Sequence, residues 1–215
     1  MEATVESPSV PETLLLNIAI TPSDYVALAA LDLSKQTLPQ GGLFCLDDIS
    51  RFPHITLYMA RFHKDRVNNV IAESKHLAGE FRQQLLKHVG YFVTPGGYYE
   101  ISYERTPSLL AMHETTTQRL APFRYNPGSP HREEYFGAYS NEQRISATNW
   151  GYDLVGSLYR PHITITRFPE GFSKVRGLPR APSSLSFTAT KIRLFEADNL
   201  GAARRPITTV ELVAT

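Results

Sequence analysis

The chain has 215 residues, 42% of them hydrophobic, and its 22 basic and 21 acidic residues give a net charge of +1. This length can bury one sizeable core, and the balanced charge provides no global attraction for long nucleic acids. The only cysteine, Cys45, excludes an internal disulfide framework and favours a reducing compartment. Residues 1–12 lack the basic residues of a signal or transit peptide, and no apolar run approaches membrane-spanning length. We expect a single cytoplasmic domain over residues 1–215.

The first half of the chain alternates strand-like and helix-like patterns. Residues 14–20 predict a strand, after which Thr21-Pro22 predicts the start of a helix that runs to about Leu38. Residues 55–62 begin with apolar and polar side chains in alternation, which predicts a half-buried strand. Apolar residues then recur at helical spacing from Asp65 to about Val89, which predicts the longest helix of the chain.

The second half begins with a predicted strand pair. Residues 91–94 and 98–103 flank the turn signal Pro95-Gly96-Gly97, which is consistent with a hairpin or with one bent strand. Thr106-Pro107 predicts a capped helix to about Ala121, with Leu109, Met112, His113, Thr116 and Leu120 on one side. Two more strands are expected near residues 186–196 and 208–213, with the turn between them at 199–201.

Residues 124–145 collect prolines, glycines, charges and aromatics without clear periodicity. We interpret this segment as a long loop. Loops of this length without secondary structure are uncommon unless they have a role. A lid over the functional site and a plain crossover or insertion are both consistent with its composition.

The tetrapeptide Pro-His-Ile-Thr occurs twice, at residues 53–56 and 161–164, each time in a short apolar run that ends in Arg-Phe. An internal duplication explains this repetition better than chance does. Because side chains alternate faces along a strand, each copy places a histidine and a hydroxyl on one face. The shared faces are His54, Thr56 and Tyr58 in the first copy, and His162, Thr164 and Thr166 in the second. Two related half-domains would then face each other, with one histidine from each.

These residues resemble the paired His-x-Thr-x motifs of the two-histidine (2H) phosphoesterases, which include the LigT or 2′-5′ RNA ligase-like proteins and the cyclic nucleotide phosphodiesterases. The two copies read His54-Ile55-Thr56-Leu57 and His162-Ile163-Thr164-Ile165, with no departure from the motif. The resemblance implies a duplicated α+β fold with two lobes, one around each motif. Antiparallel sheets would face a central cleft, and helices would lie on the outside.

The pairing of two histidines suits phosphodiester chemistry. One group must take a proton from the attacking hydroxyl or water, another must protonate the leaving oxygen, and histidine does either near neutral pH. Thr56 and Thr164 could donate to non-bridging phosphate oxygens. No metal or cofactor is required. For a 2′,3′-cyclic phosphate, the family comparison suggests His162 as base and His54 as acid, giving a 2′-phosphate.

The substrate class stays open at this point. A nucleoside or RNA-end 2′,3′-cyclic phosphate is the main expectation, while 2′-5′ linked oligonucleotides, RNA ligation and ADP-ribose cyclic phosphates are alternatives. A catalytically silent nucleotide-binding module is a hypothesis of another class. Metal binding by the two histidines, with Asp47 or Asp48 approaching from an upstream loop, is the rival chemistry.

Further side chains are candidates for substrate contact, although each has a structural interpretation as well. An aromatic ring can stack on a base, Arg61 could pair with a phosphate or with a carboxylate, and a residue of the motif face could border the phosphate. The candidates are Tyr58, Arg61, Tyr98, Tyr99, Trp150 and Thr166. We expect a monomer with no obligate protein partner and no contact with a membrane.

Overall fold

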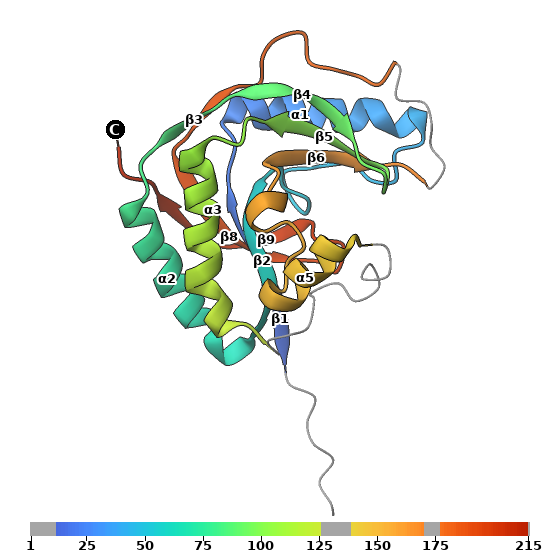
Figure 1. The fold of residues 1–215 in the computed structure, drawn as a ribbon. Coiled ribbons are helices and arrows are strands. Elements are labelled where there is room, and N and C mark those ends of the chain that lie inside the picture. The colour runs from blue at the N-terminus through green and yellow to red at the C-terminus, as the bar shows by residue number, and fades with distance from the viewer. Residues whose placement is uncertain (1–11, 126–138, 170–176, 215) are drawn as a thin grey trace, which may run out of the picture.

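The computed structural model describes residues 12–125, 139–169 and 177–214. Two antiparallel sheets dominate it, a four-stranded sheet in the order β2-β1-β8-β9 and a three-stranded sheet in the order β4-β5-β6 (Figure 1). The first sheet consists of β1 (Thr13–Ile20), β2 (Ile55–His63), β8 (Lys191–Ala197) and β9 (Ala203–Glu211). The second consists of β4 (His88–Val93), β5 (Tyr98–Tyr103) and β6 (His162–Arg167), and β3 (Gln84–Leu86) pairs with β7 (Phe187–Ala189).

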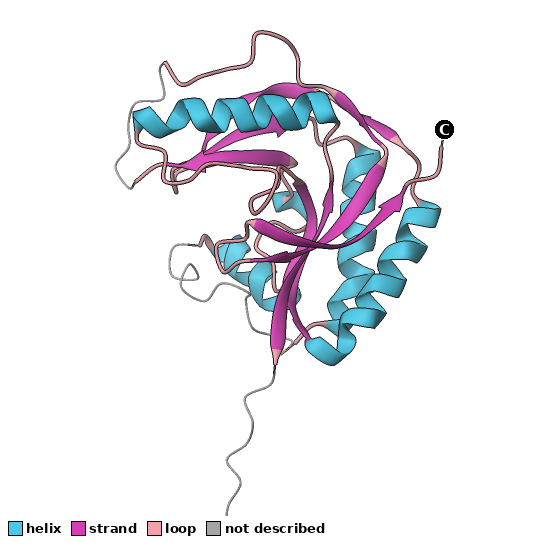
Figure 2. Cartoon of the chain, turned by 180° about the vertical axis from the view of Figure 1, so that it is seen from behind, coloured by secondary structure: helices cyan, strands magenta, loops and turns pink. Residues whose placement is uncertain are grey.

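The helices cover the outer faces of the two sheets (Figure 2). Helix α1 (Asp24–Thr37) follows β1 but packs on β6, where the buried Ser34 hydroxyl donates to the carbonyl of Ile165 at 2.7 Å. Helices α2 (Val67–Glu80) and α3 (Pro107–Leu120) pack on the four-stranded sheet and on each other. Helix α5 (Asn141–Trp150) and a 3-10 turn, η4 (Gly156–Leu158), precede β6. The expected α+β architecture of antiparallel sheets and outer helices is confirmed.

The two repeated motifs lie on different sheets. Strand β2 is an edge of the four-stranded sheet and β6 is an edge of the three-stranded sheet, and the two strands contact each other. Their apolar positions are fully buried, as Ile55 and Leu57 are in the first copy and Ile163 is in the second. Burial of these side chains fixes the register of each strand, because a slip of one residue would turn the apolar set outward.

The helix predicted from Asp65 to Val89 is wrong in its second half. Helix α2 ends at Glu80, and Phe81 has an extended backbone with φ −86° and ψ 131°. The apolar residues that continue the helical spacing, Leu85 and Val89, are 52% and 61% exposed, so they form no buried face. The chain instead forms β3 and β4, and β4 pairs with β5 as a hairpin, one of the two forms with which the Pro95-Gly96-Gly97 signal is consistent.

The long loop predicted over residues 124–145 is also too long. Helix α5 begins at Asn141, where Ser140 and Gln143 form a reciprocal capping box, and it ends at Gly151 with φ 74°. Thr106 caps α3 as expected by accepting from the amide of Leu109, whereas Thr21 caps nothing, because α1 begins after Ser23. The interpretation of the loop as a lid falls on residues 126–138, which lie outside the described residues. None of the described helices is long and apolar enough to cross a membrane.

His113 joins β2 to the η4 turn that precedes β6 through a buried imidazole. Its Nδ1 donates to the carbonyl of Leu57 on β2 at 2.5 Å, and its Nε2 accepts from the amide of Gly156 at 3.2 Å. The ring also stacks on Tyr159, with 3.9 Å between centroids. Only the neutral ring can donate from one nitrogen and accept at the other. Burial lowers the pKa of His113 to about 4, which keeps this form at neutral pH.

Acid should therefore destabilise the protein through His113. A histidine whose pKa is lowered by folding binds a proton more readily when unfolded, so stability is full above about pH 6.5 and falls as the pH drops toward 4. The loss from one such group is at most about 3 kcal/mol. Urea unfolding of wild type and His113→Gln between pH 4.5 and 7 measures it. The variant should be less stable at pH 7 and less sensitive to acid.

The exposed His76 on α2 provides the matched control for this experiment. His76→Gln should leave both the stability and its pH dependence unchanged, because the side chain of His76 is 73% exposed and the substitution removes no buried hydrogen bond. An equally steep acid dependence in His113→Gln and wild type would show that His113 carries none of it.

Candidate functional site

Both motif histidines are anchored by the same hydrogen bond. His54 Nδ1 lies 2.8 Å from the carbonyl oxygen of Phe52, and His162 Nδ1 lies 2.7 Å from that of Arg160. Each carbonyl belongs to the residue two positions before the histidine. Because a carbonyl oxygen can only accept, Nδ1 must carry the hydrogen in both rings. The unprotonated nitrogen of either neutral ring is therefore Nε2, which can take a proton and, once protonated, can give it.

The two imidazoles share one electrostatic environment. Burial is the main cause that lowers the pKa of His54 to about 4, and the positive charge of His162 lowers it further. The hydrogen bond to Phe52 opposes this shift only in part. His54 also packs beside the ring of Phe195, with 6.1 Å between centroids. At neutral pH His54 is thus a neutral imidazole, which is the form required of a general base.

A buried carboxylate faces His162. Glu100 on β5 is only 3% exposed, and its Oε2 accepts from Nη1 of Arg160 at 2.9 Å. Its Oε1 lies 3.5 Å from Nε2 of His162, a contact that becomes ionic when this ring is protonated. Glu100 is therefore placed to pair with an imidazolium at His162. Our interpretation of the sequence missed this residue, although Tyr98, Glu100 and Ser102 alternate with the buried side chains of β5.

The two motif threonines differ in their surroundings. Thr56 is partly exposed, and its hydroxyl oxygen accepts from the side-chain amide of Asn17 at 3.0 Å. Thr164 is also partly exposed and pairs across the sheet with Glu100. Thr166 is fully buried and donates to the carbonyl of Phe44 at 2.7 Å, so its hydroxyl fixes a loop against β6. The expected substrate contact of Thr166 is therefore not supported.

Two of the tyrosine candidates are also buried. Tyr58 is 0% exposed and donates to the carbonyl of Trp150 at 2.5 Å, because β2 is covered on both faces beyond Thr56. Tyr99 is 2% exposed and donates to the carbonyl of Pro179 at 2.5 Å. Neither ring has a free face for a base. The alternation that placed Tyr58 on the motif face is wrong, because the register shifts between the two residues: Thr56 pairs with Ala19 and Tyr58 with Ile18, which point to opposite faces of β1. Helix α5, which the sequence did not predict, covers Tyr58 on that other face.

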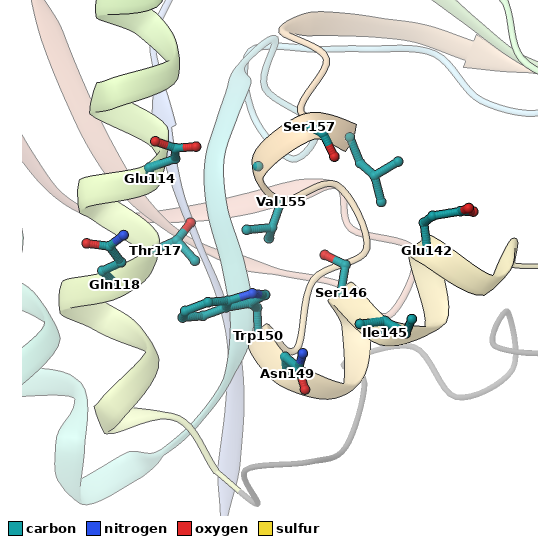
Figure 3. A pocket seen from close by; sticks show the side chains of 12 residues that line it. Glu114, Thr117, Gln118, Glu142, Ile145, Ser146, Asn149, Trp150, Val155 and Ser157 are labelled. Carbon is teal, nitrogen blue, oxygen red and sulfur yellow. The ribbon is translucent and has the colours of Figure 1, made fainter.

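The remaining candidates are partly exposed and lie on three different elements, Arg61 on β2, Tyr98 on β5 and Trp150 on α5. Arg61 near the end of β2 donates to the side chain of Asn199 at 2.8 Å, and the guanidinium of Arg167 lies over the ring of Tyr98 at 5.2 Å. Trp150 lines a pocket of about 390 Å³ between α3, α5 and η4 (Figure 3). The pocket is lined by both apolar and uncharged polar side chains and by two carboxylates, Glu114 and Glu142, and no basic residue lines it. This lining is unsuited to a phosphate.

Asp47, one of the two aspartates considered as metal ligands, is held by hydrogen bonds within its own turn. Burial alone would raise the pKa of Asp47, but hydrogen bonds from the backbone amides of Ile49, Ser50 and Arg51 lower it to about 2. Asp47 thus holds its own turn together. Within the described ranges, no three His, Cys, Asp or Glu side chains are grouped as metal ligands.

Solved structures share this fold, whereas no family model and no curated protein matches the sequence. LigT from Escherichia coli in its apo form superposes with a TM-score of 0.57 at 15% identity, covering 94% of this chain and 99% of LigT. TT0787 from Thermus thermophilus superposes with a TM-score of 0.58 at 16% identity, covering 93% and 98%. LigT has also been crystallised with 3′-AMP, at a TM-score of 0.57 and 16% identity. The chain has the LigT-like fold that its motifs predict.

The hydrogen-bond geometry predicts the tautomer of both motif histidines. At a pH where the rings are neutral, His54 and His162 should each carry the hydrogen on Nδ1, because each Nδ1 faces a carbonyl oxygen. Long-range ¹H–¹⁵N correlation spectra of the imidazole rings distinguish the tautomers, and His54→Gln and His162→Gln assign the signals. Hydrogen on Nε2 of either ring would contradict the anchoring and remove that ring as a base.

Proposed function

We propose that the protein is a phosphoesterase that opens a cyclic phosphodiester, a nucleoside or RNA-end 2′,3′-cyclic phosphate, to give a 2′-phosphate. The observation that carries the proposal is the matched anchoring of His54 and His162, which leaves Nε2 of each ring available within one electrostatic environment. A phosphate between two such nitrogens has a base on one side and an acid on the other. A LigT-like fold that has been crystallised with 3′-AMP, ATP and NADP⁺ supports a nucleotide substrate.

The surroundings of the two rings favour particular roles. His54 is neutral at pH 7, and Glu100 is placed to pair with the protonated form of His162. We therefore assign His54 as base and His162 as acid, the reverse of the roles that the family resemblance implies. His54 Nε2 takes a proton from water as the water oxygen bonds to phosphorus. The bond from phosphorus to O3′ breaks, and His162 gives its proton to O3′, leaving the phosphate on O2′.

The hydroxyls of Thr56 and Thr164 complete the site. Each lies two residues from its histidine on a partly exposed face, and each can donate to a non-bridging oxygen as negative charge builds there. Arg160 neutralises Glu100, so the buried carboxylate repels the substrate less than an unpaired charge would. Among the aromatic candidates, Tyr98 is the partly exposed ring on the strand that carries Glu100, and we propose it for contact with the base.

Turnover of the four nucleoside 2′,3′-cyclic monophosphates and of a short RNA with this end, with EDTA present, tests the proposal. His54→Ala and His162→Ala should each lower kcat by about 10²–10⁴-fold, because each removes one proton-transfer group. His76→Ala is the matched control and should retain full activity, because this side chain is exposed on α2. The position of the product phosphate, read by ³¹P NMR, identifies the leaving oxygen.

The other outcomes of that assay exclude the proposal in distinct ways. Tight binding of a cyclic nucleotide without turnover would indicate a silent binding module. Activity that appears only when a divalent metal replaces EDTA would make the histidines ligands. Joining of 2′,3′-cyclic and 5′-hydroxyl RNA ends in preference to hydrolysis would indicate a ligase.

A substrate whose leaving group needs no proton separates the roles of the two histidines. With a nucleoside p-nitrophenyl phosphate, His162→Ala should keep at least about a tenth of the wild-type rate, whereas His54→Ala should remain inactive. The acid limb of the kcat/KM profile of wild type on the cyclic substrate should lie at about pH 4, where His54 becomes protonated, and the need for a protonated general acid should add a fall on the alkaline side. Rescue of His54→Ala instead of His162→Ala by the activated substrate would restore the reverse assignment.

A further inference from the structure

Strand β1 carries one amide in an otherwise apolar run. Asn17 is 0% exposed, and its neighbours Leu16 and Ile18 are equally buried. Its backbone pairs with Met59 on β2 and with Phe195 on β8, so it sits in the middle strand of three and directly beside the first motif. Burying an amide costs free energy unless all of its hydrogen bonds are made. An aliphatic residue would be the less costly choice at this position.

The amide is only half satisfied. Nδ2 of Asn17 donates to Oγ1 of Thr56 at 3.0 Å, while Oδ1 is buried and has no hydrogen-bond partner. An unpaired buried acceptor destabilises the folded chain, because it gives up its hydrogen bonds to water without replacing them. The described residues offer Asn17 no other side-chain bond than the one to Thr56. Among the described residues, the side chain of Asn17 thus makes one hydrogen bond, to the motif residue Thr56.

This bond fixes which way the Thr56 hydroxyl is used. The amide nitrogen can only donate, so Oγ1 of Thr56 is the acceptor and its own hydrogen stays available. Within the described part of the chain, no acceptor receives that hydrogen. A hydroxyl that accepts one hydrogen bond is also polarised toward donating another. The hydrogen of Thr56 is therefore left for a group on the partly exposed side of β2, which is the side of His54.

We propose that Asn17 is a positioning residue that holds the hydroxyl of Thr56 with its hydrogen directed at a non-bridging oxygen of the substrate phosphate. This inference rests on the proposed function. It also makes the two halves of the site unequal, because no amide among the described residues holds Thr164 in this way. The hydroxyl of Thr56 is oriented before the substrate binds, whereas the hydroxyl of Thr164 becomes oriented on binding.

A double-mutant cycle on 2′,3′-cyclic nucleotide hydrolysis tests the inference. Asn17→Leu removes the donor and the unpaired oxygen but keeps a side chain of similar size. It should lower kcat by about tenfold or more with KM nearly unchanged, because the lost interaction acts on the developing charge. Thr56→Ala should lower kcat at least as much, and adding Asn17→Leu to Thr56→Ala should change nothing further. The melting temperature of Asn17→Leu should equal or exceed that of wild type.

Thr117→Val is the matched control for the removal of an unpaired buried group. The hydroxyl of Thr117 on α3 is also buried without a partner, and valine has the same shape. This variant should keep both the melting temperature and kcat. If Asn17→Leu fails to fold, Asn17→Ala takes its place in the cycle, and circular dichroism checks its structure.

The outcomes separate the inference from the proposed function. The positioning role would be overturned if Asn17→Leu kept the wild-type kcat. It would also be overturned if Asn17→Leu lowered kcat as much in the Thr56→Ala background as in wild type. Either result would leave the phosphoesterase activity standing. A fall in melting temperature that matches the loss of kcat would make Asn17 a structural residue. No turnover by wild type would overturn the proposed function and this inference together.

Discussion

The site depends on one hydrogen bond made twice, from Nδ1 of a histidine to the carbonyl two residues earlier. Without it, either ring could rotate or change tautomer, and neither Nε2 would have a defined role. The bond forms because His54 directly precedes β2 and His162 begins β6, and the buried apolar side chains of the two strands fix the backbone beside each ring. The edge strands β2 and β6 then bring the two anchored rings into one environment.

Much of the fold could be predicted from local patterns. The strand alternation at Ile55–Leu57, the cap at Thr106 and the turn at Pro95–Gly97 each act within a few residues, and the structure agrees with them. Leu85 and Val89 continue the helical spacing of α2. Their segment nevertheless forms β3 and β4, because it pairs with β7 and β5. Helix α5 was missed, although the capping box at Ser140 and Gln143 and the following glycine signalled it.

The candidate site could be predicted where the signal is a repeated motif and not where it depends on packing. His54 and His162 were found because the tetrapeptide recurs, but Glu100 and Asn17 are single residues on strands whose neighbours the sequence does not identify. Their roles follow from register, since β5 pairs with β6 and β1 pairs with β2. Tyr58 was assigned by strand parity, which a register shift between Thr56 and Tyr58 breaks.

The most direct test of the central claim is a crystal structure with a nucleoside 2′,3′-cyclic vanadate, which mimics the five-coordinate transition state. Nε2 of His54 and Nε2 of His162 should lie within hydrogen-bond distance of oxygens on opposite sides of the vanadium, with His162 nearest O3′. A vanadate that contacts only one of the two rings, or that binds elsewhere on the protein, would contradict a mechanism with paired histidines.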